Sequence, residues 1–232
     1  MIRLVTYSDD RMSKAKDLCW QSAMKYGCHD FDSYWPFNID ADFISKNIDV
    51  LSQDRGSGYW LWKPYVINKA MQNCKEDDIL IYSDAGVEFV NDVKHITSKM
   101  DQDIFFFTNG FNQMDWCKMD VIKHVAPDTK PDDKQVQASV IFFSVNNKTR
   151  AFVKEWLELA QIPGFIDDSP SKEPNHKTFA EHRHDQSILT ALQHKYGYKL
   201  HWWPTQYSEH IRIAGDVYPV MFNHNRKRNH EW

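Results

Sequence analysis

Apolar and polar residues alternate along the chain with two periods, one typical of buried strands and one typical of amphipathic helices. Short apolar or β-branched runs predict strands at residues 2–6, 31–35, 79–82, 103–108, 136–145 and 200–203. Apolar residues at helical spacing predict helices at residues 12–26, 40–51, 65–73, 148–160 and 185–196. Because strands and helices alternate, we expect a single α/β domain over residues 1–232, with a mostly parallel central sheet flanked by helices.

Three segments interrupt this pattern. A loop rich in glycine and aromatic residues, 55–64, precedes one predicted helix, and its Pro64 suits a first helical position. Residues 163–183 are polar and contain prolines, and an irregular loop of this length is usually either functional or disordered. Residues 222–232 form a polar, basic tail. We expect the loop 163–183 to help shape a ligand site.

Composition narrows the classes of partner. Hydrophobic residues make up 42% of the 232 residues, which is enough for a packed core. The formal net charge is −4 with the signs interspersed, so bulk charge predicts neither nucleic acid nor a membrane surface as a partner. The nine Trp residues can fill a core, but Trp also stacks on sugars and nucleobases. Any binding of phosphate must therefore come from a few basic side chains at one site and not from the overall charge.

The spacing of the cysteines and the length of the apolar runs indicate where in the cell the protein is located. The four cysteines show no CxxC pair and no spacing typical of a zinc finger, which favours reduced thiols: Cys19, Cys28, Cys74 and Cys117. No apolar run approaches the roughly 18–20 residues that span a bilayer. A strand pattern begins at once at the N-terminus, with no signal peptide before it. We expect a cytoplasmic protein, in the host cytoplasm if the chain is viral.

An acidic residue follows the strand predicted at residues 79–82. Asp84 lies at the carboxyl end of that strand, where ligands bind in α/β sheets. A carboxylate there can hold a hard divalent cation together with a diphosphate, and Gly86 lets the backbone approach a ligand closely. The alternative is an Asp that simply begins a turn.

Two basic residues and one acidic pair are further candidates. Lys63 can place a point charge near phosphate, and Arg55 can bind it with a bidentate fork. Their alternative roles are a surface Lys that caps the loop and a solvated Arg. Asp185 and Gln186 open a predicted helix, where a carboxylate can act on a substrate or simply cap the helix.

Several of these segments resemble one enzyme family. The stretch YSDAG at residues 82–86 resembles the DxD region of glycosyltransferases with the GT-A fold, in which a strand end holds a metal and the donor diphosphate. Asp84 matches the first Asp of that motif. Gly86 replaces the last one, and Glu88 is the candidate for the second carboxylate. Together with RGSGYWLWKP at residues 55–64, the motif resembles a branch found in viral and bacterial surface-glycan synthesis.

The resemblance extends to other parts of the chain in the same order. His224 matches a C-terminal His that completes the metal shell, and the tail with Arg226 and Lys227 would fold over the diphosphate. The expected nucleoside contacts are Thr6 and Tyr7. The residues expected to line the pocket of the donor sugar are Gln137 and Ser139. Those expected near the acceptor are Asn109, Trp202 and Trp203.

The function that the resemblance implies is metal-dependent transfer of a sugar from a nucleotide-sugar, a UDP-sugar by family preference, to a glycan acceptor. Mn²⁺ or Mg²⁺ would be held by Asp84, Glu88 and His224 and would act as a Lewis acid. An inverting enzyme needs a general base, for which Asp185 is the best candidate. A retaining enzyme would use Asp185 or Gln186 to orient the sugars, and the late Asp-Gln pair favours this outcome.

Two other functions remain open from the sequence. A sugar-1-phosphate nucleotidyltransferase would share the sheet and the metal, but it usually has a glycine-rich signature where residues 7–12 contain no glycine. A non-catalytic carbohydrate-binding module would explain the Trp content. It would not explain an acidic strand end, a late Asp-Gln helix and a basic tail on an α/β scaffold.

Overall fold

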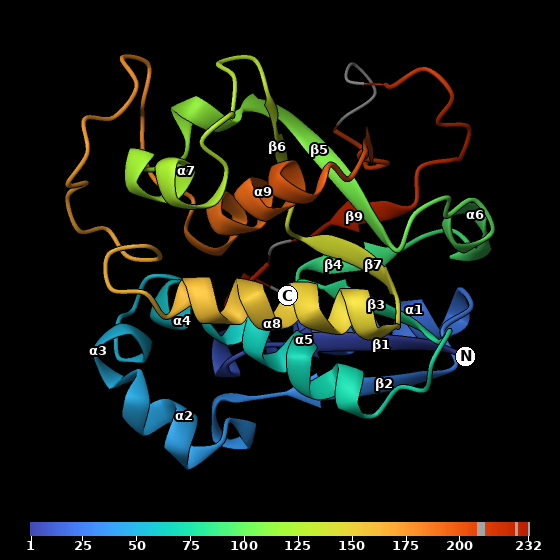
Figure 1. Ribbon diagram of the computed structural model, residues 1–232. Helices are drawn as coiled ribbons and strands as arrows, with labels where there is room; N and C mark the ends of the chain where they lie inside the picture. The colour runs from blue at the N-terminus through green and yellow to red at the C-terminus, as the bar shows by residue number, and fades with distance from the viewer. Residues whose placement is uncertain (208–211, 226, 232) are drawn as a thin grey trace.

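The computed structural model describes residues 1–207, 212–225 and 227–231 (Figure 1). Its centre is a seven-stranded sheet in the order β2-β1-β3-β7-β5-β6, in which β8 also pairs with β5. A two-stranded ribbon of β4 and β9 lies beside it. The strands are β1 (Ile2–Tyr7), β2 (Asp30–Tyr34), β3 (Ile79–Ser83), β4 (Val87–Phe89), β5 (Ile104–Asn112), β6 (Lys134–Val136), β7 (Val140–Ser144), β8 (Leu200–Trp202) and β9 (Phe222–His224).

Most strands of the large sheet point the same way. β1 is parallel to β2 and β3, and β8 is parallel to β5. β7 lies between β3 and β5 and is antiparallel to both, so those two strands share one direction. β6 is antiparallel to β5. The expected mostly parallel sheet is therefore confirmed, with β7 and β6 as its reversed members.

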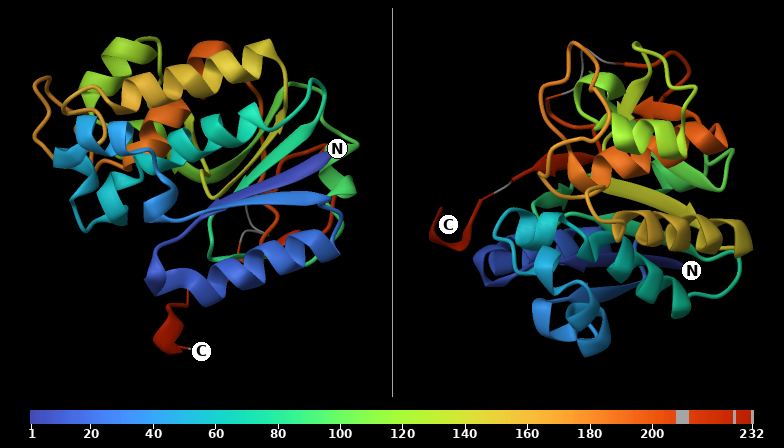
Figure 2. Two further views of the ribbon diagram at one scale, coloured as in Figure 1. Left: turned by 90° about the horizontal axis from the view of Figure 1, so that it is seen from below. Right: turned by 60° about the vertical axis from the view of Figure 1, so that its left-hand side comes forward.

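Helices cover one face of the sheet, and α1 with the β4–β9 ribbon covers the other (Figure 2). The helices are α1 (Ser13–Lys25), α2 (Ala41–Lys46), α3 (Ile48–Leu51), α4 (Gly56–Tyr59), α5 (Trp62–Gln72), α6 (Lys94–Thr97), α7 (Met119–Val125), α8 (Asn147–Ala160) and α9 (His184–Tyr196). Side chains alternate between the two layers: Leu80 and Tyr82 join the core under α5 and α8, whereas Ile81 joins the core under α1.

Two elements expected as continuous are divided. Residues 136–145 form the end of β6, a turn at 137–139 and then β7, because β6 pairs with one part of β5 while β7 must pass between β5 and β3. Gln137 and Ser139 therefore lie in a turn and not on a strand. Residues 40–51 form α2 and α3, which are separated at Asn47, where φ is −122°.

The loop 163–183 is held in place by buried polar side chains. The Lys118 ammonium donates to the Gly164 carbonyl at 2.7 Å and lies 3.2 Å from the Asp167 carboxylate. His182 accepts a hydrogen bond from the Lys118 amide on Nδ1, so its Nε2 carries the proton and donates to the Phe165 carbonyl at 2.6 Å. These bonds give the loop one conformation beside the sheet.

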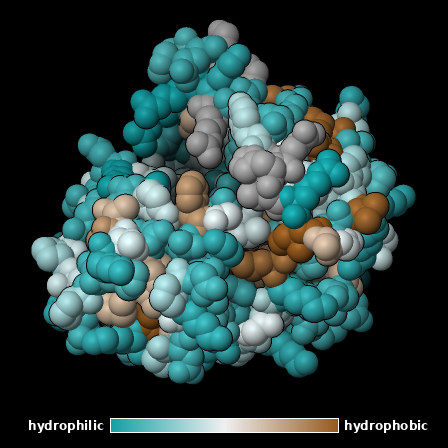
Figure 3. Space-filling model, turned by 90° about the horizontal axis from the view of Figure 1, so that it is seen from above, coloured by the Kyte–Doolittle hydropathy of each residue, from teal (hydrophilic) through white to brown (hydrophobic). Residues whose placement is uncertain are grey.

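The four cysteines are buried free thiols, as the sequence predicts. Among the described residues, none of the helices combines the length and apolar character needed to cross a membrane. On the face shown in Figure 3, hydrophilic residues predominate and the hydrophobic ones form small groups.

The glycine-rich segment before α5 forms a turn of left-handed helix. Five consecutive residues have positive φ: Gly56 at 60°, Ser57 at 51°, Gly58 at 96°, Tyr59 at 50° and Trp60 at 59°. Each residue with a side chain costs about 1–2 kcal/mol in this conformation. Strain of this kind persists where the surrounding structure enforces it, and it is concentrated at functional sites. The turn leads directly into Lys63.

We expect Gly58→Ala to lower the free energy of unfolding by about 3 kcal/mol. A Cβ at Gly58 would lie 2.7 Å from the Leu51 backbone, in addition to the strain of its φ of +96°. Gly197→Ala is the matched control, because its φ is +68° and no atom lies within 4 Å of the added Cβ. Urea denaturation of both variants measures the difference, and equal losses would contradict the proposed backbone clash.

Candidate active site

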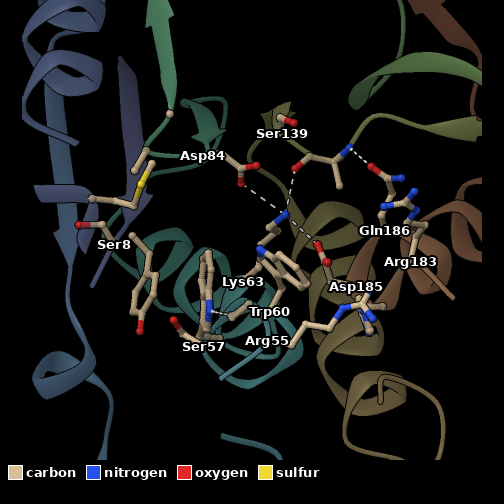
Figure 4. A pocket seen from close by; sticks show the side chains of 18 of the residues that line it. Ser8, Arg55, Ser57, Trp60, Lys63, Asp84, Ser139, Arg183, Asp185 and Gln186 are labelled. Carbon is tan, nitrogen blue, oxygen red and sulfur yellow. Dashed lines mark hydrogen bonds and ion pairs between the residues drawn. The ribbon is translucent and has the colours of Figure 1, made fainter. Parts of the chain in front are cut away.

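A cavity of about 800 Å³ opens at the carboxyl ends of β1 and β3. The left-handed turn, the turn at 137–139, the start of α9 and residues of β5 and β9 complete its walls. This is the edge at which α/β sheets bind ligands. Figure 4 shows Ser8 at one end, Arg183 and Gln186 at the other, and Lys63 between them.

A buried lysine joins two carboxylates at the floor of the cavity. The Lys63 ammonium lies 2.8 Å from the Asp185 carboxylate and 3.4 Å from that of Asp84 (Figure 4). It also donates to the Ala138 carbonyl at 3.3 Å. Lys63 lines the cavity but is only 3% exposed, and its ammonium is directed at these three internal groups. Its charge organises Asp84 and Asp185.

Burial shifts the pKa values of these groups. Burial raises the pKa of Asp185 to about 6, although the attraction of Lys63 opposes that shift. Burial alone would lower the pKa of Lys63, but the charges of Asp185 and Asp84 outweigh it and raise the value. Burial and the neighbouring Asp84 also hold the pKa of Tyr82 well above its usual range. A carboxyl whose pKa is close to neutrality is typical of a functional group.

Asp84 presents its carboxylate at the end of β3, as predicted. The Tyr82 hydroxyl donates to it at 2.5 Å, and the Asp84 amide donates to the Ser139 carbonyl at 2.8 Å. Its side chain is 35% exposed, so an oxygen remains open to the cavity. This differs from Asp185, which is buried against Lys63.

His224 reaches the same wall, whereas Glu88 does not. β4 and β9 pair with Val87 opposite His224 and Glu88 opposite Asn223. Directly opposed residues of an antiparallel pair share a face, and neighbours alternate. Glu88 and His224 therefore lie on opposite faces of the ribbon, and only His224 lines the cavity. Of the three expected metal ligands, Asp84 and His224 line the cavity and Glu88 does not.

Asp84 and His224 are the side chains that could hold a metal ion together with a bound diphosphate. Within residues 1–207, 212–225 and 227–231, no three His, Cys, Asp or Glu side chains cluster as a closed metal site. Asp84 and His224 both line the cavity, and a carboxylate with an imidazole suits Mn²⁺. The donor set thus fits a divalent cation completed by the oxygen atoms of a bound diphosphate.

The end of the cavity near β1 carries aromatic and hydroxyl groups. Tyr7 lines it and stacks on Trp62, with ring centroids 3.9 Å apart and an angle of 22° between the planes. Ser8 is 4% exposed, and its buried hydroxyl has no hydrogen-bond partner in the described structure. Thr6 is fully buried and does not line the cavity, so its expected contact with a nucleoside is not supported.

Of the basic residues predicted to contact phosphate, Arg55 lines the cavity and Lys227 does not. Arg55 lines the rim, where it forms ion pairs with Asp168 at 3.1 Å and Glu181 at 3.3 Å, both on the loop 163–183. Lys227 is exposed and is not among the residues that line the cavity. Arg226 lies outside the described residues. Arg55 therefore ties the loop to the rim.

Residues near the C-terminus contact both the cavity and the start of α1. The Asn229 side chain donates to the Ser13 hydroxyl at 2.7 Å and to the Asp10 carbonyl at 2.5 Å, and it accepts from the Lys14 amide at 3.0 Å. Arg228, just before it, lines the cavity. His224 and Arg228 thus lie at the cavity, and Asn229 is bonded to residues at the start of α1.

Some cavity residues escaped the sequence analysis. Ser8 and Arg183 adjoin predicted residues, so proximity in sequence could have identified them. Gln135 lies two residues before the predicted Gln137, whereas Phe111 gave no such signal, because β5 extends to Asn112, beyond its expected end at residue 108. The predicted Trp202 and Trp203 are instead buried in the core under α1. Their aromatic surface is used for packing.

The chain is similar to known proteins in three-dimensional structure, whereas comparisons of its sequence find no match. No protein-family model matches the chain, and no curated protein matches it by sequence. The galactosyltransferase LgtC, solved with donor and acceptor sugar analogs, has a TM-score of 0.56 at 12% identity, over 97% of this chain and 87% of LgtC. Mouse xyloside xylosyltransferase 1 has a TM-score of 0.51 at 11% identity, over 97% of this chain and 98% of that one.

A third similar structure is the bifunctional glycosyltransferase WbbM, with a TM-score of 0.51 at 10% identity. The match covers 82% of this chain but spans only 37% of WbbM. These three proteins are glycosyltransferases, and their similarity to this chain lies in the fold. The chain therefore has the GT-A fold of the glycosyltransferases to which it is similar.

Proposed function

We propose that the protein transfers a sugar from a nucleotide-sugar to a glycan acceptor. The observation that carries the proposal is the group of Asp84, Lys63 and Asp185 at the floor of a large cavity, placed where a GT-A fold binds its donor. Asp84, just after β3, lines the cavity and has a side chain that is 35% exposed. The proposed donor is a UDP-sugar.

Each part of the cavity has a proposed role. The nucleoside occupies the end with Tyr7 and the free Ser8 hydroxyl, and the diphosphate lies near Asp84 and His224. Arg228 adds positive charge from the tail, where it stabilises the departing diphosphate electrostatically. The transferred sugar then lies beside Asp185. Holding the acceptor hydroxyl close to the anomeric carbon supplies much of the rate.

Mn²⁺ or Mg²⁺ is the proposed cofactor. When bound, such an ion neutralises the negative charge that develops on the leaving diphosphate. Asp84 and His224 would hold it, and phosphate oxygen atoms would complete its shell. Lys63 lies 3.4 Å from the Asp84 carboxylate and would help to hold that side chain in place at the cavity wall.

Asp185 and Gln186 are the proposed groups at the reacting sugar. The Gln186 amide oxygen accepts from the Ala138 amide at 3.2 Å, which fixes the start of α9 against the turn at 137–139. Lys63 fixes the Asp185 carboxylate in the same region. A carboxylate held in this way is suited to orienting sugars, so we favour a retaining reaction. We also propose a cytoplasmic location, which the free buried thiols support.

Calorimetric titration with UDP, with and without Mn²⁺, tests the donor site. We expect binding that requires the metal and weakens at least about 10-fold in Asp84→Ala, because one of two protein ligands is lost. Asp128→Ala, an exposed acidic residue away from the cavity, should bind like the wild type. Binding of GDP but not UDP would remove the uridine assignment.

The rival function is a non-catalytic carbohydrate-binding module. Sugar binding in the absence of any nucleotide binding, under every metal condition, would replace the proposed function by this rival. A sugar-1-phosphate nucleotidyltransferase would instead consume a nucleoside triphosphate and a sugar phosphate. The same protein assayed with those substrates separates it from a transferase.

A further inference from the structure

One end of the cavity is not assigned above to the nucleoside or the diphosphate of the donor. It lies beyond Asp185, where the far part of β5 faces the start of α9. Arg183 and Gln186 lie at this end in Figure 4, opposite Ser8. The other residues that line it are Asn109, Phe111 and Gln135. Their chemistry, one aromatic ring among amide groups, is that of a saccharide site.

Phe111 exposes an aromatic ring to the cavity. It is 56% exposed, although it follows a run of buried residues in β5. A phenyl ring held in water is unfavourable unless a ligand covers it. Its ring lies 5.5 Å from that of Trp116 at an angle of 58°, and the Arg183 guanidinium lies 4.3 Å from the Trp116 ring. These contacts brace Phe111, so its free face is a fixed platform.

The amide groups beside the ring leave hydrogen-bond donors unused. Gln135 is 1% exposed, and its side-chain oxygen accepts from Asn109 at 3.0 Å and Gln186 at 2.8 Å. The Asn109 and Gln186 oxygen atoms accept from the amides of Phe111 and Ala138. Each amide nitrogen has two hydrogens and uses one in these bonds. The wall therefore offers N–H donors at fixed positions to the oxygen atoms of a ligand.

We propose that this end binds the acceptor as a pyranoside, with a C–H face of its ring on Phe111 and its hydroxyl oxygens on Asn109 and Gln186. The assignment rests on the proposed function, because Asp185 then lies between the acceptor and the donor. Since Gln186 follows Asp185 directly, a hydroxyl held by Gln186 is brought to the reacting centre. The Arg183 guanidinium is occupied by Trp116 and by Glu181 at 2.9 Å, which favours a neutral over an acidic sugar.

Saturation-transfer NMR with methyl β-D-glucopyranoside and methyl β-D-galactopyranoside tests the subsite, with and without UDP and Mg²⁺. We expect transfer to the ring protons of at least one pyranoside. Its affinity should fall about 10-fold in Phe111→Ala, the loss of one stacking platform. Phe111→Tyr should retain binding. Phe37→Ala is the matched control, because Phe37 is 78% exposed and does not line the cavity.

The outcomes separate this inference from the proposed function. If UDP binds but neither pyranoside does, or if Phe111→Ala binds both as well as the wild type, the subsite is overturned and the donor site stands. If Phe111→Ala weakens UDP as much as the pyranoside, the ring shapes the whole cavity and the assignment also falls. If a pyranoside binds through Phe111 and no nucleotide binds, the subsite is supported and sugar transfer is not.

Discussion

Replacing Asp185 by Asn is expected to lower the rate of sugar transfer by about 10²–10⁴-fold at pH 7.5, the range for a group that acts on the reacting atoms. Asn has nearly the same shape but no negative charge. The fully buried Asp185 carboxylate lies 2.8 Å from the Lys63 ammonium, so Asn leaves that cation with Asp84 as its sole charged partner. UDP binding should change little, because the donor diphosphate is proposed to lie near Asp84.

The dependence of the rate on pH gives this prediction a second measurement. Burial raises the pKa of Asp185 to about 6, so the carboxyl is protonated below that pH and ionised above it. If the reaction needs the carboxylate, kcat rises as the pH increases through about 6 and then levels. Asp185→Asn should lose this rise as well as the rate. The control Asp128→Asn should keep both, because Asp128 is exposed outside the cavity.

A low rate in Asp185→Asn has meaning only if the variant folds. Thermal unfolding and UDP titration should therefore match the wild type before the rates are compared. A folded variant that keeps more than about one tenth of the wild-type rate would contradict a role at the reacting centre. The pH profile would then belong to another group.

The sequence predicted the site residues that are fixed by local pattern. Asp84 follows a short apolar strand, and Asp185 lies at the start of α9, so each position depends on a few neighbours in sequence. Because α/β sheets bind ligands at the carboxyl ends of their strands, the position of Asp84 after a strand also predicts that it lies at the ligand-binding edge. The His224 prediction depended on resemblance, and the pairing of β9 with β4 does place that residue beside the end of β3.

The errors concern facts that depend on tertiary structure. Strand register puts Glu88 on the face opposite His224, and nothing in the local sequence specifies that register. β5 continues past its apolar run to Asn112, with a register shift against β6 between Thr108 and Asn112, and Phe111 in this part of the strand lines the cavity. The burial of Lys63 depends on α5, β3 and α9 meeting at one point. A lysine next to a glycine-rich loop gives no sign of that enclosure.

Lys63→Met is expected to lower the free energy of unfolding by about 3–5 kcal/mol, because it removes one partner of a buried ion pair and leaves charge without compensation. Two carboxylates, those of Asp185 and Asp84, lose the same cation. Met fills a similar volume, so loss of packing contributes little. Lys148→Met, an exposed lysine near the start of α8, is the matched control and should change stability by less than about 0.5 kcal/mol.

The loss in Lys63→Met should depend on pH in a way that packing cannot reproduce. Without Lys63, burial and the charge of Asp84 still raise the pKa of Asp185 and the attraction of the ammonium no longer opposes them, so this pKa in the folded protein rises further above the ordinary value of 3.8. A carboxyl with a raised pKa contributes stability below its unfolded pKa and loses it as the pH rises through the folded pKa. Urea denaturation should therefore show a smaller deficit at pH 5 than at pH 8. Because Asn at position 185 removes the uncompensated charge, Lys63→Met combined with Asp185→Asn should recover part of the deficit at pH 8. A deficit that is equal at both pH values and unchanged in the double variant would mean that Lys63 stabilises the cavity floor by packing and not by its charge.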